Sequence, residues 1–271
     1  SLTACGSGAN TQESEAGSSE PVIVKVGVVG EYNAQWDTIN ELLADDGIQV
    51  ELVKFTDYAA PNRALDDGEI DLNAFQHKAF LANDIQQKGY DIVDIGDTII
   101  APLGIYNNKD KISSIEDIKE GDVIAIPSDL TNGGRALKLL EAAGLIECDP
   151  AKGVVPTKAD ITKYNTQIEI MEAESATLAN ILPDCAAAII NGGNAFTAGL
   201  NPLTDTIFVE DVNPETNPAV PDLVNVIVAR TEDKDNETYL KIVEAYHTAE
   251  VQETIEEEYQ GAFVCAWEGA E

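Results

Sequence analysis

The chain has 271 residues, and 44% of them are hydrophobic, which is enough for the core of one large or two modest domains. Its 49 acidic and 16 basic residues leave a formal net charge of −33, which repels the phosphates of nucleic acids and anionic lipids. The sequence also lacks any run of about 18 apolar residues, the length that spans a bilayer. Composition therefore argues against a nucleic-acid partner and against a membrane-spanning segment.

The N-terminus is similar to a lipidation signal. Residues 2–5, Leu-Thr-Ala-Cys, resemble the lipobox that ends a bacterial lipoprotein signal peptide, in which the cysteine receives the lipid. Small and polar residues without an apolar period follow as far as residue 20, which is typical of a flexible tether. We therefore expect residues 1–21 to carry a lipid anchor on Cys5 and a tether on the extracytoplasmic face of the cell membrane. The alternative is an arbitrary disordered end.

Strands and helices alternate from residue 22 onward. The apolar run at residues 22–29 is rich in β-branched residues and predicts a central strand that Gly30 ends. A helix should follow at residues 34–46, with Trp36 and Ile39 on its apolar stripe. The next expected elements are a strand at 48–55, a short helix at 61–67, a strand at 70–74, a helix at 78–88 and an extended stretch at 92–106. This alternation predicts an α/β fold with parallel sheets covered by helices.

A second set of such units follows residue 107. Its expected elements are strands at 122–127, 168–172, 185–190 and 223–229, and helices at 133–143, 175–182, 234–247 and 250–260. We expect the extended segments 101–106 and 223–229 to be paired hinge strands that join two lobes, with a ligand between the lobes. Small molecules usually bind at such domain interfaces in α/β folds.

Arginine is scarce, and one of the three arginines follows two glycines. Gly133 and Gly134 should open a helix whose free backbone N–H groups can receive an anion, and Arg135 adds a two-pronged donor suited to a carboxylate. The alternative is that Asn132 caps the helix and Arg135 is merely solvated. The segment lacks the Gly-Lys-Ser/Thr of a phosphate-binding loop.

Aromatic and amide side chains stand at the ends of expected strands. Tyr58, Phe75 and His77 could line the mouth of one lobe, where aromatic faces would pack a thioether or an aliphatic chain. Asn191 and Asn225 could bind the amine or carboxylate of a ligand. The alternatives are core packing for the aromatic residues and a turn for Asn191, which precedes two glycines.

The spacing of cysteine and histidine gives no support to a metal or redox centre, so we expect no cofactor and no metal. The two histidines, His77 and His247, lie far apart in the sequence, and no Cys-x-x-Cys motif occurs. With Cys5 set aside, three cysteines remain, which allows at most one disulfide; they are Cys148, Cys185 and Cys265.

Several stretches together resemble the methionine-binding lipoproteins of ABC importers, the MetQ/NlpA family. They are VGVVG, the FQHK segment at residues 75–78, NGGRALKLL at 132–140, INGGNAF at 190–196 and VNVIVAR at 224–230. The resemblance covers the chain after the tether. It implies a monomer with a two-lobed periplasmic-binding-protein fold, type II-like, that binds L-methionine or a close relative and delivers it to an ABC permease and ATPase. We expect one lobe at residues 22–105 with 226–271, and the other at 106–225.

The resemblance also implies roles for the candidate residues. Arg135 would bind the ligand carboxylate, Asn191 and Asn225 would bind its polar backbone groups, and the side-chain pocket would consist of Tyr58, Phe75 and His77. The chain departs from the family at Asn194, where relatives usually have a tyrosine. The loop at residues 212–222 also looks longer than usual, which could alter the rim of the site.

Other functions remain open from the sequence. The ligand could be a methionine-containing dipeptide or another amino acid. An enzyme would need His77 as a general base, but no nucleophile stands at motif spacing. A surface adhesin would fit the anchor and the acidic surface, and it would have no ligand in a cleft.

Overall fold

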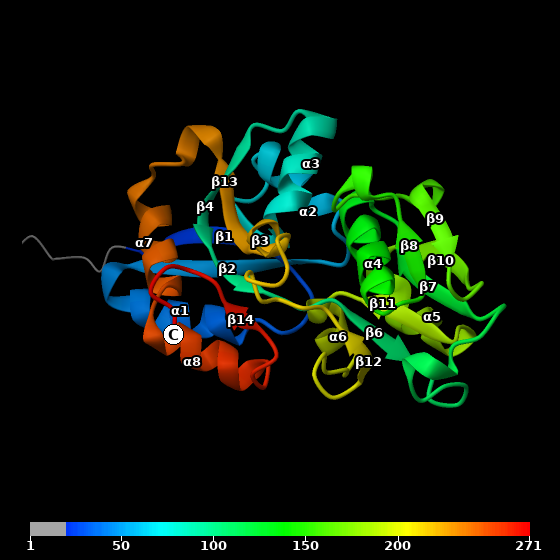
Figure 1. Ribbon diagram of the computed structural model, residues 1–271. Coiled ribbons are helices and arrows are strands. Elements are labelled where there is room, and N and C mark those ends of the chain that lie inside the picture. Colours follow the sequence, from blue (N-terminus) through cyan, green and yellow to red (C-terminus); the bar gives the residue numbers. More distant parts are fainter. Residues whose placement is uncertain (1–19) are drawn as a thin grey trace, which may run out of the picture.

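The computed structural model describes residues 20–271, and its strands form two five-stranded sheets in two lobes (Figure 1). Cys5 and most of the expected tether lie outside the described residues. The first sheet has the order β2 (Ile48–Phe55), β1 (Val22–Val29), β3 (Leu72–His77), β13 (Asn225–Arg230) and β4 (Ile92–Asp97). β1 runs parallel to β2 and β3, whereas β13 is antiparallel to both of its neighbours. Within residues 20–271, no helix is long and apolar enough to cross a bilayer.

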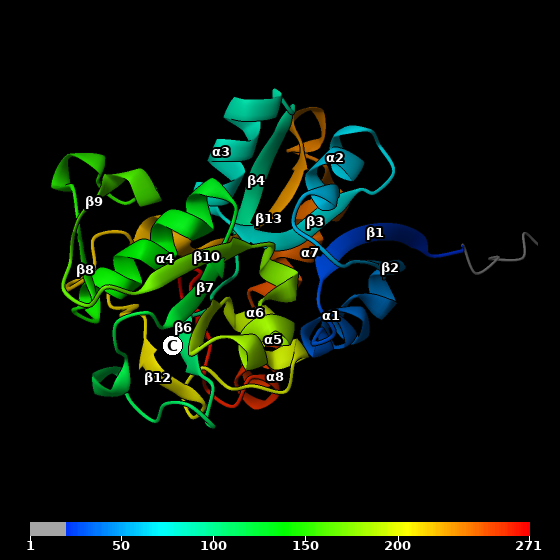
Figure 2. The ribbon, with the colours of Figure 1, turned by 90° about the vertical axis from the view of Figure 1, so that its right-hand side faces the viewer.

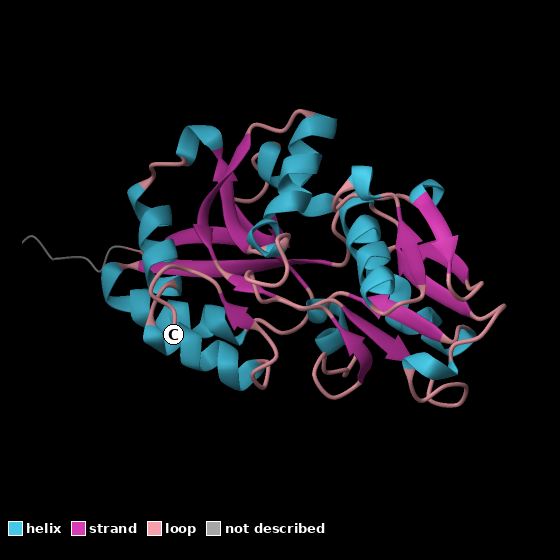
Figure 3. Cartoon of the chain, in the orientation of Figure 1, coloured by secondary structure: helices cyan, strands magenta, loops and turns pink. Residues whose placement is uncertain are grey.

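Helices cover both faces of the first sheet (Figure 3). α1 (Ala34–Leu43), α7 (Glu237–Tyr246) and α8 (Ala249–Glu258) pack on one face, and α2 (Ala60–Asp66) and α3 (Lys78–Lys88) pack on the other. Successive residues of β13 enter the two cores in turn, because side chains alternate across a strand: Val226 lies on the α2 side and Ile227 on the α1 side. Burial on both faces explains why the middle of β13, residues 226–229, is a continuous apolar run.

The second sheet has the order β10 (Glu169–Ala173), β7 (Val123–Pro127), β11 (Ala187–Ile190), β6 (Gly104–Asn107) and β12 (Thr206–Val209). Its helices are α4 (Leu130–Ala142), α5 (Leu178–Ile181) and α6 (Gly192–Thr197). Two small sheets pair β8 (Ile146–Cys148) with β9 (Ile161–Tyr164) and β14 (Val264–Cys265) with β5 (Ile99–Ile100). Across the boundary between the lobes, α3 lies beside α4 (Figure 1, Figure 2).

The expectation of paired hinge strands is wrong. β6 pairs with β11 and β12 in the second sheet, and β13 pairs with β3 and β4 in the first. Each strand already has a neighbour on both sides, so its backbone groups are satisfied inside its own lobe. The chain instead crosses between the sheets at residues 101–103 and 210–224, which contain no strand.

The cysteines of the described residues form no disulfide. Cys148, Cys185 and Cys265 are all free thiols. Burial is the first cause of a raised pKa at each of the three. They are therefore protonated side chains near neutral pH, and two of them, Cys148 and Cys185, are buried in the second lobe.

Candidate functional site

A cavity of about 110 Å³ lies between the two lobes. Residues from both sheets line it, including Ala74 and Phe75 of β3 and Asn191 at the end of β11. A single buried water needs only about 10–15 Å³ of such space, so the cavity has room for a small organic molecule. All of the expected ligand-binding residues line this cavity: Tyr58, Phe75, His77, Arg135, Asn191 and Asn225.

Three aromatic rings of the first lobe form one wall. The ring centroids of Tyr58, Phe75 and Phe80 lie 5.8 to 6.0 Å apart in every pair. Phe80 was not expected from the sequence, although it stands three residues after His77, where the first turn of α3 brings it back over the same site. Flat apolar faces of this kind bind aliphatic chains and thioethers.

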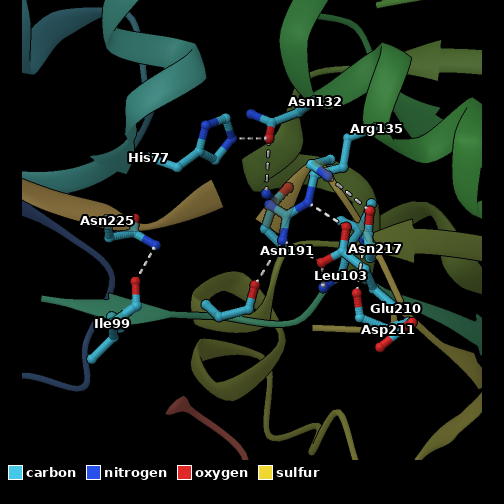
Figure 4. Close-up of polar contacts among 12 residues, drawn as sticks. His77, Ile99, Leu103, Asn132, Arg135, Asn191, Glu210, Asp211, Asn217 and Asn225 are labelled. Carbon is cyan, nitrogen blue, oxygen red and sulfur yellow. Dashed lines mark hydrogen bonds and ion pairs between the residues drawn. The ribbon is translucent and has the colours of Figure 1, made fainter. Parts of the chain in front are cut away.

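His77 joins the aromatic wall to the second lobe. Its Nδ1 accepts a hydrogen bond from the backbone N–H of Phe80 at 3.1 Å and so caps α3. The proton must then be on Nε2, which donates to Oδ1 of Asn132 in α4 at 2.8 Å (Figure 4). With both ring nitrogens engaged, His77 has no free lone pair with which to act as a general base.

Burial, with the nearby charge of Arg135, lowers the pKa of His77 to about 3. The unfolded chain therefore takes up a proton as the pH falls below about 6.5, whereas the folded protein does not until about pH 3. The contribution of His77 to the free energy of unfolding is therefore fully present above pH 6.5 and is lost as the pH falls towards 3. We expect His77 to account for a loss of about 2 kcal/mol between pH 7 and pH 5, measured by urea denaturation. His77→Gln is the control, because its remaining pH dependence between pH 7 and pH 5 comes from the carboxylates. If wild type and His77→Gln lose the same stability over this range, His77 does not contribute to the loss.

Arg135 projects from α4 towards the cavity and forms a buried ion pair with Glu210. Its Nε donates to Glu210 Oε2 at 2.7 Å, and its Nη2 donates to Glu210 Oε1 at 2.6 Å and to the carbonyl of Ala101 at 2.9 Å (Figure 4). The Arg135 and Glu210 side chains are only 8% and 7% exposed, so the pair is shielded from water. Glu210 was not expected from the sequence, in which it is one of 49 acidic residues.

The expectation that Gly133 and Gly134 open the helix is wrong. α4 begins at Leu130, because the side chain of Asp129 accepts a hydrogen bond from the Asn132 N–H at 3.0 Å and caps the helix. The Gly133 N–H bonds to the carbonyl of Asp129 at 2.7 Å and is no longer free for an anion. On this helix, the group that can bind an anion is therefore the guanidinium of Arg135 and not the Gly133 N–H.

Amide side chains complete the polar side of the cavity. Asn132 does not cap α4; its Oδ1 accepts from His77 and, at 3.3 Å, from Nδ2 of Asn191. The Oδ1 of Asn191 is buried and has no hydrogen-bond partner within residues 20–271, which leaves an acceptor free for a ligand amine. Asn225 donates from Nδ2 to the carbonyl of Ile99 at 3.1 Å, near the crossing between the lobes.

Asn194, the residue at which the sequence departs from the resembled family, also connects the lobes. Its Nδ2 donates to the hydroxyl of Tyr58 at 3.0 Å. Burial raises the pKa of Tyr58, so this hydroxyl stays protonated. Asn194, which is shorter than the tyrosine usual in relatives, thus contacts the aromatic wall directly through the Tyr58 hydroxyl.

We expect Asn194→Ala to weaken ligand binding by about two- to tenfold, because one neutral hydrogen bond of about 0.5–1.5 kcal/mol is lost from the closed arrangement of the lobes. Isothermal titration calorimetry measures the change. Asn165→Ala is the matched control, since Asn165 donates to the carbonyl of Gly144 within one lobe. Equal affinity of Asn194→Ala and wild type would remove this contact from the closing surface.

Phe196 of α6 makes an apolar contact between the lobes. The helix follows β11 of the second sheet, yet the ring is buried in the core cluster of the first lobe. Its centroid lies 5.7 Å from Tyr32, 5.2 Å from Tyr259 and 5.4 Å from Phe263. Beside it, Thr197 accepts from the backbone N–H of Glu31 at 3.2 Å. The lobes are thus held together by packing as well as by hydrogen bonds.

Comparison with known proteins identifies the relatives of this chain. The sequence model of the NlpA lipoprotein family matches residues 24–267. The chain belongs to the NlpA lipoprotein family. Among the family's curated members, it is 45% identical over 218 residues to outer membrane lipoprotein 3 of Mannheimia haemolytica, with 80% of each chain covered. It is 39% identical over 252 residues to the D-methionine-binding lipoprotein MetQ of Salmonella typhimurium, covering 92% of this chain and 90% of the relative.

Solved structures confirm the two-lobed α/β fold expected for this family. Protein PG110 of Staphylococcus aureus aligns with a TM-score of 0.85 at 40% identity, covering 90% of this chain and 94% of its own. A nutrient-binding protein of Burkholderia cenocepacia, solved with bound methionine, aligns with a TM-score of 0.83 at 35% identity, covering 90% and 100%. A structure of the methionine-binding protein MetQ aligns with a TM-score of 0.84 at 38% identity, covering 90% and 98%.

Proposed function

We propose that this chain is the extracytoplasmic substrate-binding lipoprotein of an ABC importer, and that it binds L-methionine or a close relative between its lobes. One observation carries the proposal: the cavity between the lobes joins the aromatic wall of one lobe to Arg135 and the unpartnered Asn191 Oδ1 of the other. An α-amino acid with a thioether side chain needs these three features. A relative named for D-methionine binding and a solved structure with bound methionine support a ligand of this class.

Each candidate residue has a role in this proposal. Arg135 binds the ligand carboxylate, Asn191 accepts from its ammonium group, and Asn225 contacts its backbone end near Ile99. The thioether chain lies against Tyr58 and Phe75, with His77 at the boundary of the lobes. His77 acts here as a neutral hydrogen-bond donor, and the cavity does no chemistry on its ligand.

The lobes close on the ligand. We assign residues 22–105 with 226–271 to one lobe and residues 106–225 to the other. Ligand contacts come from both lobes, so binding favours the closed state over an open one. The His77–Asn132 and Tyr58–Asn194 hydrogen bonds form across the same boundary and would break on opening.

The partners follow from this role. A lipid on Cys5 would hold the protein, as a monomer, at the outer face of the cell membrane, where it would deliver its ligand to the permease and ATPase of the importer. The acidic surface that excludes nucleic acid does not conflict with such a position, because the anchor and tether separate the lobes from the lipid headgroups.

Thermal melting with a panel of amino acids tests the proposal. A ligand that binds only the folded state stabilises it by about 2.7 kcal/mol at one hundred times its dissociation constant, so L-methionine should raise the melting temperature by several degrees. Alanine and glutamate are the controls for a general amino-acid effect. A midpoint unchanged by millimolar L-methionine, D-methionine and methionine dipeptides would refute the proposal.

A further inference from the structure

The charge of the cavity depends on a residue that does not line it. Among the described residues that line the cavity, Arg135 is the one that carries a formal charge at neutral pH. Burial keeps the His77 imidazole neutral, and no carboxylate of the described residues lines the wall. Arg135 alone would therefore give the cavity a net positive charge.

Glu210 lies behind Arg135 and cancels that charge. Both of its carboxylate oxygens accept from the guanidinium, at 2.7 and 2.6 Å, and the pair is buried. These bonds use Nε and Nη2, so Nη1 is the guanidinium nitrogen without a protein hydrogen bond within residues 20–271. Arg135 can still donate to a ligand carboxylate, but from an ion pair whose net charge is zero.

Glu210 is itself fixed by the segment that crosses between the lobes. Its Oε1 accepts from the Leu103 N–H at 3.2 Å, and its own N–H donates to the Leu103 carbonyl at 2.9 Å. The Ala101 carbonyl accepts from Arg135 on the same segment. The counter-charge is therefore held at a constant position relative to the guanidinium.

We propose that Glu210 sets the charge preference of the cavity, so that the site selects a net-neutral zwitterion over an anion with the same side chain. The proposal rests on the proposed function, since it assumes that an amino acid binds beside Arg135. An uncompensated guanidinium would attract any carboxylate and repel an ammonium group nearby. The neutral pair removes that repulsion, and the free Asn191 Oδ1 then accepts from the ammonium group. Glu210 is a positioning residue and does not touch the ligand.

The test compares two ligands by calorimetry at pH 7: L-methionine and its α-hydroxy analogue, which keeps the carboxylate and the thioether but lacks the ammonium charge. In Glu210→Gln, the ratio of affinities should shift towards the hydroxy analogue by about tenfold, because the ammonium group now meets an uncompensated charge. Glu210→Asp keeps the charge but shortens the side chain, so its ratio should stay close to that of wild type. Equal weakening of both ligands in Glu210→Gln would show a purely structural role and overturn the proposal.

A double variant keeps the proposal testable if Glu210→Gln does not fold. Arg135→Gln with Glu210→Gln buries no charge and returns the cavity to neutrality. Both ligands should weaken, while their ratio stays at the wild-type value. A shift of the ratio towards L-methionine would mean that Arg135 acts as a bare positive charge, and the proposal would fail. Wild-type protein that binds neither ligand would refute the proposed function instead, which separates the two failures.

Discussion

Arg135→Ala is expected to lower the free energy of unfolding by about 3–5 kcal/mol, because it leaves the Glu210 carboxylate buried without its partner. The same change should weaken L-methionine binding by at least about tenfold, since a charge-assisted hydrogen bond contributes about 1.5–3 kcal/mol. Urea denaturation measures the first effect, and calorimetry measures the second. Replacing a solvated arginine would cause no such loss of stability, so the measurement tests whether Arg135 is buried in an ion pair.

Two controls separate binding from stability. Arg135→Ala with Glu210→Ala removes both charges, so it should regain much of the stability while binding stays weak. Arg63→Ala is the matched single change, because Arg63 is exposed on α2, and it should leave both quantities near their wild-type values. If Arg135→Ala keeps wild-type affinity, the guanidinium is not the carboxylate anchor.

Phe196→Ala is expected to weaken ligand binding by up to about a hundredfold. Truncating a buried phenylalanine costs about 3–5 kcal/mol, and here much of that loss falls on the contact between the lobes. A smaller closed fraction lowers the apparent affinity in proportion. Calorimetry with L-methionine gives the affinity, and small-angle X-ray scattering gives the change in shape.

Phe208→Ala is the matched control for that change. Phe208 packs against the core of the second lobe, so its removal should reduce stability without altering closure. If Phe196→Ala binds L-methionine as tightly as wild type does, Phe196 does not hold the lobes together. If both lose affinity to the same extent, general destabilisation is the cause.

The order of helices and strands was largely predictable from the sequence, whereas long-range geometry was not. The apolar run that became β1 and the stripe of α1 are local patterns, and the structure confirms both. The start of α4 was misplaced, because two glycines suggested a turn and the Asp129 cap outweighed them. The pairing of the hinge segments was wrong because strand neighbours are chosen by tertiary packing and not by local sequence.

The candidate site shows the same division. Residues in recognisable motifs, such as His77 and Arg135, were predictable as candidates, and the structure brings them to one cavity. Glu210 was not predictable, because it lies 75 positions from its partner Arg135 and no local pattern marks it among the other acidic residues. Asn132 was predicted as a possible cap, but it instead contacts Asn191 in its own lobe and His77 across the boundary between the lobes, and no local pattern in the sequence marks either contact.

Calorimetric titration of L-methionine into ligand-stripped protein tests the central claim most directly. The account predicts one methionine per chain with micromolar or tighter affinity, about −8 kcal/mol or better, and a marked loss of affinity in Arg135→Ala. Absence of heat and of saturation at millimolar L-methionine, from protein that retains a cooperative unfolding transition, would contradict it.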